Sequence, residues 1–92
     1  MKATKFDTYD DILDAYEAQD GRAGYCFDNE GEVTRFWVLL PTGVMSRLNI
    51  GDNGWNVTLE PDGTVTVTPS IWNHSPPGEW HGFLTCDEFV SC

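Results

Sequence analysis

The segment from Trp55 to Thr68 constrains the fold more than any other, because its pattern fits a β-hairpin. Large apolar residues alternate with polar ones as far as Glu60, and Thr alternates with Val from residue 64 onward. Such alternation is typical of a strand with one buried and one solvated face. Pro61-Asp62-Gly63 separates the two runs and favours a turn, because proline fixes φ, aspartate bonds the local backbone and glycine accepts positive φ. The sequence therefore predicts an antiparallel hairpin.

Further β-rich runs precede and follow this hairpin. Aromatic and β-branched residues predict strands at residues 24–28, 32–40, 80–85 and 88–92, while residues 44–50 fit a short strand or a loop equally well. Asn29-Glu30-Gly31 and Cys86-Asp87 favour tight turns, Gly51-Asp52-Asn53-Gly54 favours a turn, and residues 73–79 favour a loop.

One helix is predicted from Tyr9 to Gln19. Thr8 is a suitable N-cap, and Gly21 suits a left-handed C-cap. Helical spacing places an apolar stripe on one face of this segment: Tyr9, Ile12, Leu13 and Tyr16. We therefore expect an α+β fold in a single domain, residues 1–92, with a short N-terminal helix (about 9–19) packed on an antiparallel sheet of about five to six strands (22–92).

Negative charge is concentrated near the N-terminus of this acidic chain, whose net charge is -10. Residues 7–32 contain nine acidic side chains and one basic side chain. Such a surface repels nucleic acid and anionic membranes, and a basic protein surface is its natural partner. The alternative is an ordinary solvated helix face. The acidic residues proposed to bind a partner are Asp10, Asp11, Asp14, Glu17, Asp28, Glu30 and Glu32.

The three cysteines do not form a recognisable pair, which argues against a secreted disulfide scaffold. The N-terminus lacks the apolar run of a signal peptide, and the longest apolar run, residues 36–40, is too short to span a bilayer. We therefore expect a cytoplasmic protein. His81, Cys92 and Cys26 are the candidate metal ligands, but their spacing does not match a zinc motif, so we expect no cofactor.

Catalysis by a nucleophile would require a Cys or Ser held by a base. Cys86 or Cys92 with His81 and Asp87 would supply the residue types, but no local signature supports this set, and we expect no enzymatic activity. Trp72 and Trp80 flank the predicted loop. They either close the end of the core or form an aromatic partner-binding edge.

The C-terminal half carries a resemblance to a known group of proteins. The segments Thr68-Pro69-Ser70-Ile71, Trp80-His81-Gly82-Phe83-Leu84-Thr85 and the final run 88–92 resemble a family of small phage and prophage proteins of unknown function. The resemblance covers about residues 54–92 and implies a compact β-rich fold of phage or mobile-element origin. Some relatives have a Cys directly before the strand histidine, where this chain has Trp80.

Phage origin, small size and strong negative charge together are similar to an anti-CRISPR protein. The resemblance implies an inhibitor that acts in the host cytoplasm and binds a basic surface of a host protein or ribonucleoprotein complex. It implies neither direct nucleic-acid binding nor membrane binding. The alternative is a small phage protein with a structural or metal-supported role.

Overall fold

The computed structural model describes residues 1–51, 53–76 and 78–92. Asp52 and Pro77, which the sequence assigns to a turn and a loop, lie outside the described residues. The described residues form one helix and eight strands: β1 (Thr4–Lys5), α1 (Tyr9–Ala18), β2 (Gly24–Glu30), β3 (Val33–Leu39), β4 (Met45–Leu48), β5 (Asn56–Leu59), β6 (Val65–Asn73), β7 (Trp80–Thr85) and β8 (Glu88–Ser91).

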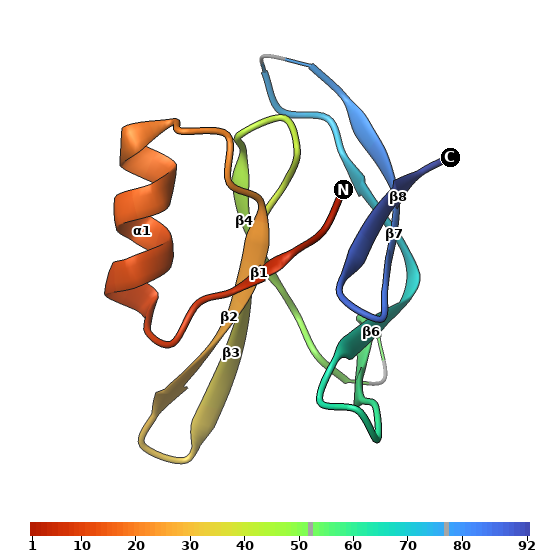
Figure 1. The fold of residues 1–92 in the computed structure, drawn as a ribbon. Coiled ribbons are helices and arrows are strands. Elements are labelled where there is room, and N and C mark those ends of the chain that lie inside the picture. The colour runs from red at the N-terminus through yellow and green to blue at the C-terminus, as the bar shows by residue number, and fades with distance from the viewer. Residues whose placement is uncertain (52, 77) are drawn as a thin grey trace.

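The strands form two sheets, whereas the sequence predicted one. Their orders are β1-β2-β3-β4 and β5-β6-β7-β8, and all neighbouring strands are antiparallel except β1 and β2. The α+β class is confirmed, but a single sheet of about five to six strands is wrong. Alternation along a strand shows that one face is buried, and it does not show which other strand covers that face. Figure 1 shows the two sheets side by side with α1 beyond the first.

Helix α1 begins and ends close to the predicted residues. The Thr8 hydroxyl accepts a 3.2 Å hydrogen bond from the Asp11 backbone N–H, as an N-cap does. The left-handed C-cap is Gln19, with φ 49°, so the helix ends one residue before the predicted end. Its apolar face packs on the outer side of the first sheet, where the cluster consists of Phe6, Ile12, Ala15, Cys26 and Leu39.

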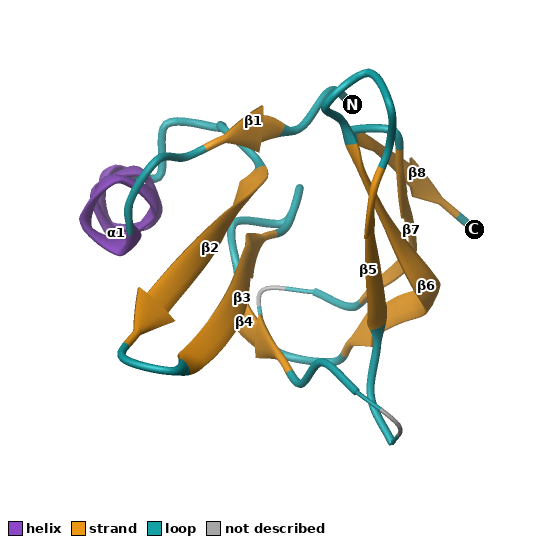
Figure 2. Cartoon of the chain, turned by 90° about the horizontal axis from the view of Figure 1, so that it is seen from below, coloured by secondary structure: helices purple, strands orange, loops and turns teal. Residues whose placement is uncertain are grey.

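The main core lies between the two sheets (Figure 2). Tyr25 and Phe36 from the first sheet are fully buried there, together with Val67 and Leu84 from the second. Trp80 joins them and packs edge-on against Phe89, with ring centroids 5.7 Å apart. Because the core has both sheets as walls, the outer face of the second sheet is left to solvent.

Two hairpin turns follow from local chemistry. In the β5–β6 turn, Asp62 accepts hydrogen bonds from the backbone and hydroxyl of Thr64, and Gly63 has φ 87°. In the β7–β8 turn, Cys86 and Asp87 both have positive φ, at 47° and 59°. This pair of left-handed residues matches the right-handed twist of the flanking strands. Both turns were predicted from the sequence.

No helix in the described parts of the chain is long and apolar enough to cross a membrane.

Candidate active site

A β-bulge in β6 brings a hydroxyl and an imidazole together on the outer face of the second sheet. Val67 pairs with Leu84, and the next β6 residue in register, Ile71, pairs with Gly82. The register therefore advances four residues on β6 and two on β7, so two extra residues bulge from β6. Such bulges redirect side chains and are common beside active sites. Here the bulge directs Ser70 toward the neighbouring strand.

Ser70 meets His81 across the β6–β7 pair. The Ser70 Oγ lies 3.0 Å from the His81 Nε2, and both residues are half-buried. This distance is a hydrogen bond between a hydroxyl and the nitrogen of a base. An imidazole in that position can take the hydroxyl proton while the oxygen attacks a carbonyl carbon. The pair therefore has the residue types and the spacing of a nucleophile with its general base.

The His81 ring is held by an aromatic neighbour. Trp72, its cross-strand partner on β6, stacks on it with ring centroids 4.9 Å apart and 22° between the planes. Trp72 also lies 4.7 Å from the His74 ring, and the His74 Nδ1 is 2.9 Å from a Glu79 carboxylate oxygen. Within the described part of the chain, no carboxylate forms an ion pair with His81. Ring orientation therefore comes from stacking.

The bulge is fixed from the other side by Trp55. Its indole Nε1 donates a hydrogen bond of 3.2 Å to the Ser70 carbonyl oxygen. Trp55 also packs against the main core, so the bond ties the bulge to the rigid part of the fold. Beside it, a surface hollow of about 230 Å³ is lined by Asn53, Gly54, Trp55 and Pro69.

Three large apolar side chains are exposed around this pair. Trp72 is 56% exposed, Phe83 42% and Val90 52%. Phe83 pairs with Val90 across β7 and β8, and it is two residues from His81 on the same strand, so these side chains share the outer face. Exposed aromatic groups beside a nucleophile offer contact area to a substrate.

The predicted acidic residues lie on the opposite side of the molecule, along α1 and the β2–β3 hairpin. Asp10, Asp28 and Glu30 line one open groove of about 570 Å³, where Glu30 is paired with Arg35. Asp11, Asp14, Glu17 and Glu32 are exposed separately along the helix and at the hairpin turn. The structure therefore brings together three of the seven acidic residues. Their role in partner binding stays a prediction.

The remaining candidates are dispersed over the fold. Trp72 is exposed, whereas Trp80 is 7% exposed and belongs to the core. Cys26 is buried beneath α1, where burial and then the charges of Asp28, Asp11 and Asp7 raise the pKa of its thiol to about 11. Among the described residues, no three His, Cys, Asp or Glu side chains are close enough to hold a metal ion.

The proposed Cys–His–Asp set does not form either. Asp87 uses its carboxylate to accept 2.8 Å hydrogen bonds from the Tyr25 hydroxyl and the Val65 backbone N–H. Cys86 has a contact of 3.8 Å with the Thr66 hydroxyl, and the Cys92 backbone pairs with His81. The hydroxyl beside His81 belongs to Ser70, which lies in the P-S-I segment and was not predicted to have a role. The two segments that carry the family resemblance contain the pair, because Ser70 lies in the first and His81 in the second.

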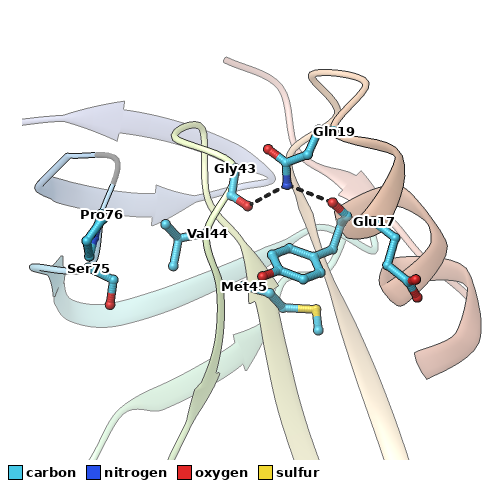
Figure 3. A pocket seen from close by; sticks show the side chains of 8 residues that line it. Glu17, Gln19, Gly43, Val44, Met45, Ser75 and Pro76 are labelled. Carbon is cyan, nitrogen blue, oxygen red and sulfur yellow. Dashed lines mark hydrogen bonds between the residues drawn. The ribbon is translucent and has the colours of Figure 1, made fainter.

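A larger hollow, of about 590 Å³, lies between the end of α1, the β3–β4 turn and the segment after β6 (Figure 3). Gln19 spans one side, because its Nε2 donates to the carbonyl oxygens of Tyr16 at 2.7 Å and Gly43 at 3.1 Å. Among the described residues that line it, Ser75 and Pro76 continue the chain from β6. This hollow offers binding space, while the Ser70–His81 pair offers chemistry.

Comparison with known proteins agrees with that chemistry. Residues 15–92 match the family of the bacterial ubiquitination-like system serine protease (BubE). No curated protein and no solved structure matches the chain significantly. The prediction of a non-catalytic, anti-CRISPR-type inhibitor is therefore wrong, as are its structural or metal-supported alternative and the expectation of no enzymatic activity. Negative charge was a poor guide, because it suits a solvated surface as well as a docking surface. The match covers most of the chain, which therefore belongs to the BubE family of bacterial ubiquitination-like system serine proteases.

Proposed function

We propose that this chain is a serine protease whose nucleophile is Ser70 and whose general base is His81. The observation that carries the proposal is the 3.0 Å contact between the Ser70 Oγ and the His81 Nε2. The family match supports it from an independent direction, because it names the same class of chemistry. We infer that the substrates are proteins or conjugates of a bacterial ubiquitination-like system.

The reaction begins with proton transfer from Ser70 to His81. The Ser70 Oγ attacks the scissile carbonyl carbon, and its proton passes to the His81 Nε2. The resulting imidazolium then donates that proton to the leaving amine as the carbon–nitrogen bond breaks. An acyl group remains on Ser70. Water, deprotonated by the same imidazole, attacks this ester and releases the acid with the hydroxyl restored.

His81 must accept at Nε2, so its resting proton is on Nδ1. In many serine hydrolases a carboxylate fixes this tautomer and the ring orientation. Here the stacked Trp72 fixes the ring plane, at 22° and 4.9 Å. The reaction therefore relies on a dyad supported by an aromatic contact.

An ester substrate tests the dyad without knowledge of the natural substrate. We expect p-nitrophenyl acetate to give a burst of one p-nitrophenolate per chain, because acylation of Ser70 releases the phenolate before water attacks the ester. Ser70→Ala and His81→Ala should each lose the burst. Ser91→Ala, which alters an exposed serine on the same sheet, should retain it. An unchanged burst in Ser70→Ala would refute the assignment.

A further inference from the structure

The backbone of β6 next to Ser70 has one uncovered side. The His81 carbonyl oxygen accepts a hydrogen bond of 2.9 Å from the Cys92 backbone N–H, so the backbone groups of His81 face β8. N–H and C=O groups of one strand residue face the same neighbouring strand, and those of the next residue face the opposite one. Because Trp72 pairs with His81, the Trp72 N–H and C=O face away from β7.

On that side of β6, strand β5 begins too late in the chain to pair with Trp72. The last β5–β6 pair is Asn56 with Thr68. The chain before β5 turns away, since the Trp55 backbone N–H donates to the Asn49 carbonyl at 2.8 Å. The Ser70 carbonyl oxygen accepts its hydrogen bond from the Trp55 indole Nε1 and not from a β5 backbone N–H. Of the described strands, none pairs with Trp72 on this side, although its side chain is 56% exposed.

We propose that the substrate binds as an extended polypeptide strand added to this open edge of β6. A strand is the occupant that the edge requires, because one N–H and one C=O are presented together at Trp72. The edge is also continuous with the nucleophile, two residues away on β6. The inference rests on the proposed function, and it specifies how a protein substrate would reach Ser70.

The exposed indole of Trp72 favours an apolar side chain in the bound segment. A substrate residue opposite Trp72 would place its side chain against the exposed indole, as cross-strand neighbours do. The chain would enter past the hollow beside Pro69, and residues that follow β6 line the larger hollow. The substrate residue opposite Trp72 would exchange backbone hydrogen bonds with it, and the residues before and after would direct their backbone groups away, since a strand alternates its hydrogen-bonding direction.

This alternation gives a sharp test. Acetyl-tetra-alanine diphenyl phosphonate phosphonylates an active serine and releases phenol. Methylating its backbone nitrogens one at a time should lower the labelling rate about 3- to 10-fold at the single position whose N–H donates to the Trp72 carbonyl oxygen. Methylation at the other positions should change the labelling rate little. Uniform sensitivity, or none, would overturn strand addition.

A non-peptide fluorophosphonate separates the two proposals. If it labels Ser70 while the labelling rate of the peptides does not depend on which nitrogen is methylated, the serine protease assignment stands and strand addition is wrong. If neither reagent labels Ser70, the proposed function fails and the inference fails with it.

Amide exchange in the unlabelled protein provides a second readout. The Trp72 N–H should exchange at least about 10-fold faster than the Ile71 and Asn73 amides, which face β7. Phosphonylation by the tetrapeptide should slow exchange at Trp72, and the non-peptide reagent should not. Protection of the Trp72 amide in the free protein would show that its edge is already covered, and would contradict the proposal.

Discussion

The indole Nε1 of Trp55 donates a 3.2 Å hydrogen bond to the Ser70 carbonyl oxygen and so links the start of β5 to the bulge on β6. The bond joins a residue packed on the core to the proposed nucleophile, although 15 positions separate them in the chain. A bulge interrupts the ladder locally, so its geometry depends on such additional contacts.

Trp55→Phe should therefore impair catalysis more than folding. It keeps most of the packing and removes the donor, which is worth about 1 kcal/mol in a typical neutral hydrogen bond. We expect the acylation rate to fall about 5- to 10-fold and the urea midpoint to change little. Full acylation activity in this variant would show that the bulge is held without the indole bond.

Removing the ring that stacks on His81 should lower the rate of ester hydrolysis. Trp72→Ala removes the contact and should lower esterase kcat about 10-fold, since aromatic pairs contribute about 0.5–1.5 kcal/mol. Trp72→Phe keeps an aromatic face and should restore most of this rate. Equal rates for both variants would exclude an orienting role for the ring.

Asp87 connects the two sheets and should be important for stability. Its carboxylate accepts from the Tyr25 hydroxyl and the Val65 N–H, and its φ of 59° lies in the left-handed region. Asp87→Ala should lower the free energy of unfolding by about 2–4 kcal/mol, because it leaves two buried donors unpaired.

Asp87→Asn is the matched control for this effect. Asparagine keeps an acceptor oxygen and tolerates positive φ, so we expect it to cost about 1 kcal/mol. Urea unfolding of the two variants makes the comparison. A loss in the asparagine variant as large as that in the alanine variant would contradict the role given to the acceptor oxygen.

Stability should decline in alkaline solution because of Cys26 and Tyr25. Burial raises the pKa of the Cys26 thiol from 9.0 to about 11. Burial, the hydrogen bond to Asp87 and the charge of Asp87 raise the pKa of Tyr25 well above its ordinary value. Both folded-state pKa values are raised, so the folded state keeps protons that the unfolded state releases. This contribution is complete below about pH 9 and is lost as the pH rises through about 11.

The urea midpoint should therefore be constant from pH 7 to 8.5 and fall by pH 10.5. Cys26→Ala should lower the midpoint at every pH, since it leaves a cavity, but should make the alkaline decline shallower. A midpoint in the unaltered protein that does not change up to pH 10.5 would contradict both shifts.

Local elements of this fold were predictable, whereas their assembly was not. The hairpin from Trp55 to Thr68 and the helix from Tyr9 are encoded by nearby residues, through alternation, capping and turn chemistry. The division into two sheets depends on which buried faces meet. That choice is made by contacts such as Tyr25 with Asp87, which are 62 residues apart.

The Ser70–His81 pair was missed for the same reason. His81 was singled out, and Cys86 or Cys92 was considered as its nucleophile, whereas Ser70 was given no role. Ser70 reaches His81 because two extra residues bulge from β6, and no local pattern marks that bulge apart from Pro69. Similarly, Trp72 and Trp80 look equivalent in sequence, and only the strand register places one outside and the other in the core.

Intact mass after treatment with diisopropyl fluorophosphate tests the Ser70–His81 assignment most directly. We predict one adduct per chain, located at Ser70 by peptide mapping, absent from Ser70→Ala and formed at least about 100-fold more slowly in His81→Ala, because loss of the base removes general-base assistance. Absence of an adduct from the unaltered protein, or an adduct that persists in Ser70→Ala, would contradict Ser70 as the nucleophile.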